Sequence, residues 1–223
     1  MKKIFVLMTK EWKLFFYTPF ALVIVPLFLV LCGTYYYSSL DRYLNLTDPN
    51  QTLKAVSTVN ITTHLIIPFL QNLLNIFIFI TPIITMRSFS EEKKLGSYDL
   101  LISYPIHPLE IFLGKFFGTL TLSLGLLLMS FIFVGFTILK GDVFIPQVAS
   151  AYLGLFLFIL FYNAVGVFAS LLTENQIVAA LIGYGVFFST ILFQWLAYVS
   201  GAPWDQFFQT FFSFLISRVL GRA

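Results

Sequence analysis

The side chains able to form ion pairs or hold a partner gather in residues 87–115, which contain four of the 13 Lys and Arg residues and four of the 10 Asp and Glu residues. Ser88 and Glu91 have the spacing of a capping box, in which a hydroxyl and a carboxylate satisfy unpaired backbone N–H groups. We expect a helix to begin there and to bend at Gly96. It must end before Pro105, because the residue preceding a proline is pushed towards extended geometry. This stretch, here called the connector, is therefore predicted to contain short helices.

The residue types that could catalyse a reaction are far apart in the sequence. An intramembrane enzyme needs a nucleophile beside a base or a pair of carboxylates, but His64 and His107 fall at opposite membrane faces and the apolar runs contain no carboxylate. The lone Cys32 gives neither a disulfide framework nor a metal cluster. No G-x-x-x-x-G-K-[ST] loop occurs that could cradle a nucleotide phosphate. We expect no catalytic residue, no metal site and no cofactor bound by this chain.

The composition indicates a membrane protein. Of the 223 residues 59% are hydrophobic and 10% are charged, against roughly 25% charged in an ordinary soluble domain. So few charges cannot coat a soluble protein of this size, and the lipid bilayer is the expected surrounding. The net charge of +3 is too small to suggest a nucleic acid partner.

Long uncharged runs predict the membrane spans, because a helix needs about 20 apolar residues to cross a bilayer. Barrel strands would alternate apolar and polar residues, whereas these runs are apolar throughout. We expect an all-α membrane protein with a single domain and five transmembrane helices, at residues 18–40, 65–86, 116–139, 146–172 and 177–200. Residues 202–223 are predicted to be an outer amphipathic tail, which either folds along the outer leaflet or precedes a last span missing from the sequence.

The N-terminal segment has the pattern of an interfacial helix. Residues 1–17 space apolar side chains at helical intervals and place lysines between them, as in helices that lie on a membrane surface. Thr18-Pro19 would then turn the chain into the bilayer. Alternatively, the lysines are only a topology signal.

The distribution of Lys and Arg predicts a cytosolic N-terminus, since cytosolic segments retain positive charge. Eight such residues then fall inside, namely Lys2, Lys3, Lys10, Lys13, Arg87, Lys93, Lys94 and Lys115. Three fall outside, namely Arg42, Lys54 and Lys140. With five spans Arg218 and Arg222 also lie outside, which runs against the rule.

Few polar residues are expected inside the membrane. They include Gln71, Asn75, Asn163 and Gln194. These amides either bond helices to one another or line a transport pathway or a dimer seam. Gly114 and Gly118 form a G-x-x-x-G motif that predicts close helix packing, and Gly125 continues the same face.

The connector is longer and more organised than a plain link requires. It carries apolar Leu95, Leu100 and Leu101 among its charges. Two interpretations fit: the connector is a docking surface for a soluble partner, or its apolar residues only seat it on the membrane.

Residues 86–106, continued through 110–115, resemble the signature of type-2 ABC transporter permeases. The resemblance is closest to the bacterial exporter subgroup that contains the gliding-motility-associated permease. The shared pattern runs through Glu91-Glu92, Lys93, Gly96-Ser97, Leu100-Leu101, Pro105 and Gly114-Lys115. The likeness extends over most of the chain in the order of its elements, although only the connector is specific. That family usually has six spans.

The resemblance implies a permease subunit of an exporter in a bacterial plasma (inner) membrane. It implies that the connector is a coupling helix seated in a groove of a separate cytosolic ABC ATPase subunit, and that ATP and Mg are bound by that ATPase. A second permease copy or a homologous permease would complete the transporter. The coupling residues would be Glu91, Glu92, Lys93, Leu95, Gly96, Ser97, Asp99, Leu100 and Leu101.

Rival functions differ in what they require. An ion-coupled secondary transporter needs ionisable groups near the bilayer midplane, and the five predicted spans contain no Asp, Glu, Lys or Arg. A non-transporting scaffold or assembly subunit stays open, because it could dock a cytosolic partner through the same connector. Stimulation of an ATPase would distinguish the two. The cargo is left open as well.

Overall fold

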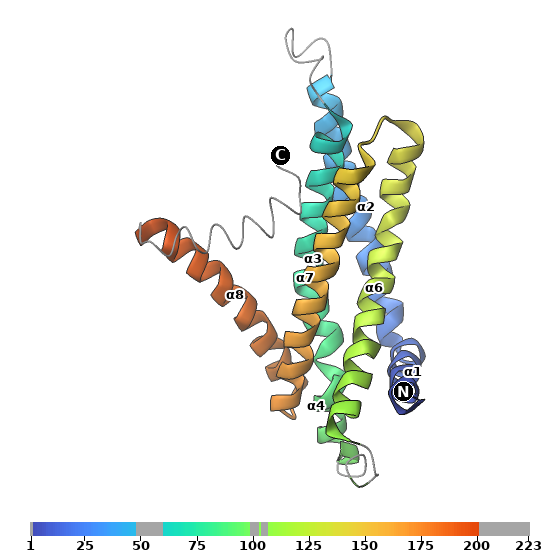
Figure 1. Ribbon diagram of the computed structural model, residues 1–223, viewed down its shortest axis with the longest axis vertical. Coiled ribbons are helices and arrows are strands. Elements are labelled where there is room, and N and C mark those ends of the chain that lie inside the picture. The colour runs from blue at the N-terminus through green and yellow to red at the C-terminus, as the bar shows by residue number, and fades with distance from the viewer. Residues whose placement is uncertain (1, 48–59, 99–102, 104–106, 201–223) are drawn as a thin grey trace.

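The computed structural model describes residues 2–47, 60–98, 103 and 107–200, with side chains given from residue 4 onwards except at 190 and 193–200. Over these ranges the chain forms helices and turns, without a strand. Long helices run side by side in a bundle, and one further helix diverges from it (Figure 1). The expectation of an all-α membrane protein is confirmed.

The helices follow one another with short links. Their bounds are α1 Lys2–Tyr17, α2 Pro19–Thr47, a π-helical turn Thr62–Ile66, α3 Ile67–Thr85, α4 Arg87–Lys94, α6 Pro108–Lys140, α7 Ile145–Leu172 and α8 Gln176–Ser200.

Among the residues that the structure describes, four helical stretches are long and apolar enough to cross a membrane. They are Pro19–Thr47, Thr62–Lys94, Pro108–Lys140 and Ile145–Leu172. The helix α8 covers the predicted fifth span with 25 residues of backbone, and its described apolar part is Gln176–Ser189. The predicted tail at 202–223 lies outside the described residues.

The helix α3 forms the centre of the bundle. In its most apolar window 61% of the residues are buried, against 22% in the corresponding window of α2. Phe69, Leu70 and Phe77 of α3 are fully enclosed, and the ring of Phe77 lies 5.6 Å from that of Phe28 on α2. The close packing of large side chains gives α3 little freedom to move independently of its neighbours.

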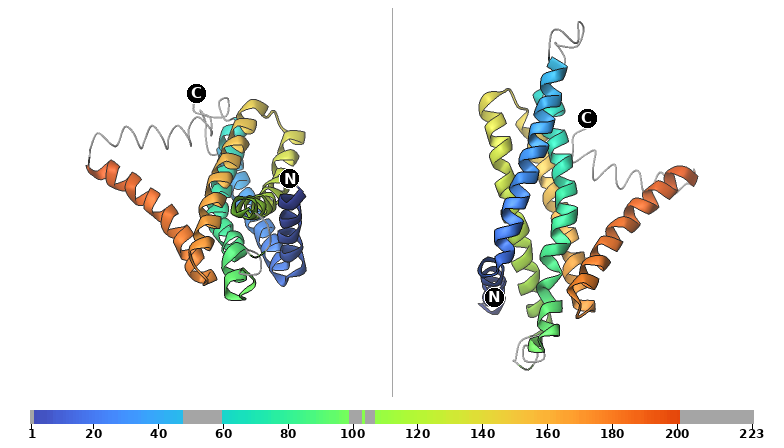
Figure 2. Two further views of the ribbon diagram at one scale, coloured as in Figure 1. Left: turned by 60° about the horizontal axis from the view of Figure 1, so that its bottom comes forward. Right: turned by 180° about the vertical axis from the view of Figure 1, so that it is seen from behind.

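The helix α1 runs across one end of the bundle, beside the first half of α6 (Figures 1 and 2). It ends at Tyr17, and Pro19 begins α2, so the predicted break at Thr18-Pro19 is confirmed. Proline suits that position because its missing N–H would be unpaired in a first helical turn anyway.

The predicted capping box at Ser88 and Glu91 is wrong. Met86 has helical dihedral angles (φ −56°, ψ −30°) and donates its N–H to the Pro82 carbonyl at 2.8 Å. The helix therefore continues from α3 into α4, so that no unpaired N–H group needs a side-chain cap. Glu91 instead pairs with Arg87 one turn earlier.

Reciprocal capping occurs at the start of α6. The Leu109 N–H donates to Nδ1 of His107 at 3.3 Å, and the His107 N–H donates to Oε2 of Glu110 at 3.3 Å. The helix α6 begins at Pro108 and runs unbroken to Lys140. The last part of the connector thus forms the first turns of α6.

The bend at Gly96 is present. The helix α4 ends at Lys94, and Gly96 has φ +69°, a left-handed conformation that glycine adopts without steric cost. Ser97 and Tyr98 are helical again.

Candidate functional site

Four charged side chains meet where α1, α4 and α6 come together, and we call them the basal ion cluster: Lys10, Glu11, Glu92 and Lys115. The Lys115 Nζ lies 2.8 Å from Oε1 of Glu11 and 3.0 Å from Oε2 of Glu92. Lys10 closes the cluster at 2.6 Å from Oε1 of Glu92. The side chains of Lys115, Glu11 and Glu92 are only 2%, 8% and 13% exposed. Two positive and two negative charges compensate one another, as buried charges require.

Two glycines let α1 approach Lys115 closely. A Cβ atom on Gly114 would lie 2.6 Å from the Cβ of Leu7, and one on Gly118 would lie 2.8 Å from the Cβ of Glu11. Gly114 and Gly118, predicted to allow close helix packing, lie where α1 crosses α6. Their lack of side chains brings the carboxylate of Glu11 to the ammonium of Lys115.

Lys115 also has partners on α4. Its Nζ donates a hydrogen bond to the Ser88 carbonyl and lies 5.0 Å from the ring centroid of Phe89. An ammonium has three N–H donors, and here three oxygen atoms surround it, from Glu11, Ser88 and Glu92. One side chain therefore joins α6 to both α1 and α4.

Lys115, counted above among the cytosolic basic residues, is not solvated but buried, since it is only 1% exposed. It lies two turns inside α6, on the face that α1 covers, and its two flanking glycines were the signal for that contact. Glu11 was missed as well. It is an acidic residue among lysines on α1 and shares a helical face with buried Leu7 and Phe15, which is the signal that could have identified it.

Burial raises the pKa of Glu11 above its ordinary value of 4.5, and this effect outweighs the attraction of Lys115 that lowers it. The cluster thus holds one carboxyl group that takes up a proton more readily than a solvated one.

Most of the charged residues predicted to couple to an ATPase have partners inside the chain. Glu91 forms a two-pronged ion pair with Arg87 at 2.9 and 3.1 Å. Lys93 donates to the Leu171 carbonyl at 2.6 Å, at the end of α7. Ser97 donates to the Glu92 carbonyl at 3.2 Å. These side chains fasten the connector to the bundle, and their contact with a partner protein stays a prediction.

Leu95 is the predicted docking residue that the structure presents to the surroundings. It follows the last residue of α4 and is 73% exposed. Gly96 beside it is exposed too. Asp99, Leu100 and Leu101 lie outside the described residues.

The polar residues expected inside the membrane fall into two environments. Asn163 on α7 is fully buried and donates to the Phe116 carbonyl of α6 at 3.2 Å. Gln71 and Asn75 are exposed on α3, one turn apart on the same face. The side chain of Gln194 is not among those described.

The arrangement is suited to transmitting motion. Within residues 2–47, 60–98, 103 and 107–200, no group of three or more His, Cys, Asp and Glu side chains is placed to hold a metal ion. The basal ion cluster instead joins α1, α4 and α6 through ion pairs.

Comparison with known proteins identifies the family. The family described as ABC-2 family transporter protein matches residues 5–217. The comparisons with curated proteins and with solved structures find no match. Since the matched region includes the bundle, α1 and the connector, this chain belongs to the ABC-2 transporter family of membrane permeases.

Proposed function

We propose that the chain is the permease subunit of an exporter and that the connector receives the force of ATP hydrolysis from a separate cytosolic ABC ATPase, which binds ATP and Mg. The observation that carries the proposal is Leu95, a large apolar side chain held 73% exposed at the end of α4. Apolar anchors that fill a pocket on a partner contribute a large share of binding energy.

The connector can pass force to three helices. Lys93 is bonded to the end of α7, and Glu92 is paired with Lys115 of α6. Phe89 is buried, and its ring stacks on that of Phe112 at 6.5 Å. Because α4 also continues α3 without a break, a displacement of Leu95 would move the packed helices together.

A second permease copy or a homologous permease would cover the exposed amides of α3. Gln71 and Asn75 lie in a span whose surroundings offer few hydrogen-bond partners, so leaving them against lipid is costly. The helix α8 does not cover this face: Tyr184 bonds the Phe79 carbonyl at 2.7 Å, and beyond that contact α8 diverges from the bundle (Figure 1). A seam or a pathway between two protomers would give these amides partners.

The charge distribution supports an inner-membrane protein with a cytosolic N-terminus. Lys10, Arg87, Lys94 and Lys115 lie on α1, on α4 or in the first turns of α6, which share one end of the bundle (Figure 1). Such clustering marks the cytosolic side. The connector pattern favours a function like that of the gliding-motility-associated exporters.

The test is Leu95→Glu, with Leu44→Glu as the matched control, since Leu44 is also exposed but on α2. We expect Leu95→Glu to lower co-purification of the ATPase and its stimulation by at least about tenfold, as for loss of an interface anchor of about 1.4 kcal/mol or more. The control should retain both. Equal stimulation by the two variants would refute the coupling role.

A second variant, Glu91→Lys with Gly96→Pro, breaks the ion pair with Arg87 and the bend together. It should abolish transport and weaken ATPase co-purification while leaving membrane insertion intact. An ATPase that binds the unmodified chain but is not stimulated would identify the alternative, a scaffold subunit.

A further inference from the structure

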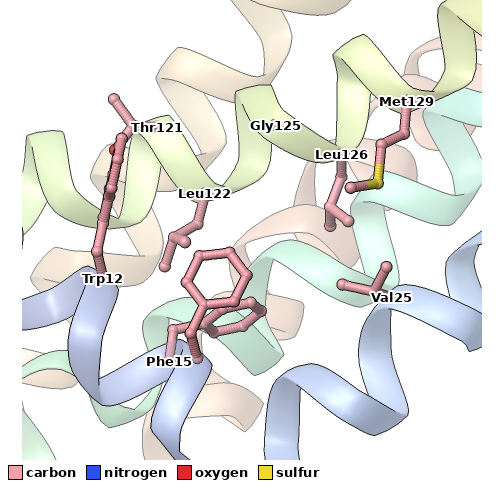
Figure 3. A pocket seen from close by; sticks show the side chains of 9 residues that line it. Trp12, Phe15, Val25, Thr121, Leu122, Gly125, Leu126 and Met129 are labelled. Atoms are coloured by element: carbon pink, nitrogen blue, oxygen red, sulfur yellow. The ribbon is translucent and has the colours of Figure 1, made fainter.

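A groove opens between α1, α2 and α6, next to the basal ion cluster but separate from it (Figure 3). It encloses about 180 Å³, and we call it the α1–α6 groove. Its lining consists of Trp12, Phe15, Phe16, Val25, Thr121, Leu122, Gly125, Leu126 and Met129.

The groove exists because α1 and α6 touch and then separate. At Gly114 and Gly118 an added Cβ would collide with α1, but at Gly125 nothing lies within 4 Å of it. The expectation that Gly125 continues the tight packing face is therefore wrong. The chain leaves α1 at Thr18 and enters α2, which leaves an opening beside the next turns of α6.

The lining is suited to hydrocarbon. None of the nine lining residues is charged, and the indole N–H of Trp12 donates to Oγ1 of Thr121 at 2.7 Å, so this polar pair is satisfied. An apolar cavity of about 150 Å³ accepts benzene, so this volume suits a segment of about six carbons. A peptide would bring amide groups that such a lining does not satisfy.

A cation lies next in sequence to residues that line the groove. Lys13 is exposed; it follows Trp12 directly and precedes Phe16 by three residues, which makes it a neighbour of Phe16 on the helix surface. Exposed Phe5, Trp12 and Phe16 next to Lys13 form the pattern of a helix at the interface of an anionic membrane.

We propose that the α1–α6 groove binds one acyl chain of an anionic phospholipid, drawn from the leaflet on which α1 lies, with the phosphate beside Lys13. The medium around α2 and α6 is hydrocarbon, so a lipid chain can enter from the side. The bound lipid fills the opening between α1 and α6 beyond the point where the glycines hold the two helices together.

The probe is phosphatidylglycerol brominated on its acyl chains, which quenches tryptophan fluorescence on contact. Trp195→Phe with Trp204→Phe leaves Trp12 as the single tryptophan. In vesicles of unbrominated phosphatidylcholine, we expect brominated phosphatidylglycerol to half-quench Trp12 at a mole fraction at least threefold lower than brominated phosphatidylcholine does.

Two further variants locate the lipid. Gly125→Leu fills the groove and should remove the low-mole-fraction quenching, whereas Gly185→Leu, placed in equally open space on α8, should retain it. Lys13→Gln alters only an exposed side chain and should abolish the preference for phosphatidylglycerol. Quenching that is the same for both lipids, or that is unaffected by both Gly125→Leu and Lys13→Gln, overturns the proposal. The measurement is made without the ATPase and is independent of the proposed function.

Discussion

The ammonium of Lys115 lies 2.8 Å from a carboxylate oxygen of Glu11, although the two residues are 104 positions apart in the sequence. Lys115 belongs to α6 and Glu11 to α1, and the same ammonium pairs with Glu92 on α4 at 3.0 Å. The N-terminal helix is therefore bound to the connector through buried charges. It does not lie on the bundle through apolar contact alone.

Lys115→Met should be strongly destabilising. The substitution leaves Glu11 and Glu92 without their central partner, and removing one member of a buried ion pair costs about 3–5 kcal/mol. We expect a lower melting temperature in detergent and faster proteolysis of α1. Lys94→Met is the control, because Lys94 is exposed on the same connector and surface substitutions change stability by about 0.5 kcal/mol or less.

A neutral double-mutant cycle tests the pair itself. Glu11→Gln and Lys115→Met should each destabilise, and the double variant should lose less stability than the sum of the two single losses, because contacting residues are energetically coupled. A double-mutant cycle of melting temperatures gives the coupling. Additive losses would show that the two residues contribute separately.

Gly114→Ala should push α1 away from α6. Its new Cβ would lie 2.6 Å from the Cβ of Leu7, and overpacking of this kind costs about 1–3 kcal/mol. Gly125→Ala meets nothing within 4 Å and should be neutral or up to about 1 kcal/mol more stable, since alanine favours helix. Thermal unfolding of both variants measures the difference, and equal stabilities would contradict the close crossing.

The raised pKa of Glu11 predicts a pH dependence. Between its ordinary value of 4.5 and the raised value, the folded chain keeps a proton that the unfolded chain has lost. Stability contributed by this group therefore falls as the pH rises through that window. The melting temperature of the unmodified chain should drop relative to that of Glu11→Gln over the same range, and a constant difference between the two would be inconsistent with a raised pKa.

The orientation is open to a labelling experiment. In a Cys32→Ser background, a cysteine at Ser97 should react with a membrane-impermeant reagent only from the cytosolic side. A cysteine at exposed Asp142, in the turn between α6 and α7, should react only from outside. Reversed labelling would invert the proposed topology.

The helices could be predicted from the sequence because uncharged runs and helical spacing are local properties. The bend at Gly96 could also be predicted from the sequence, since a glycine after a charged helix marks the C-terminus of that helix. The continuity of α3 and α4 could not be predicted from the sequence, because the Ser88–Glu91 pattern occurs inside a helix as readily as at its start. The burial of Lys115 could not be predicted either, because it depends on how α6 is rotated against α1.

The unbroken run from Thr62 to Lys94 has 33 residues and a length of about 50 Å at 1.5 Å per residue, well beyond the roughly 30 Å of a bilayer core. Because the run is one continuous helical backbone, a tilt imposed at its charged end would reach the opposite end through Pro82 and the π-helical turn. There the Thr62 hydroxyl accepts the Phe144 N–H at 2.9 Å. Loss of that hydrogen bond, at the end of the bundle opposite to the connector, would therefore indicate that the helical run has moved.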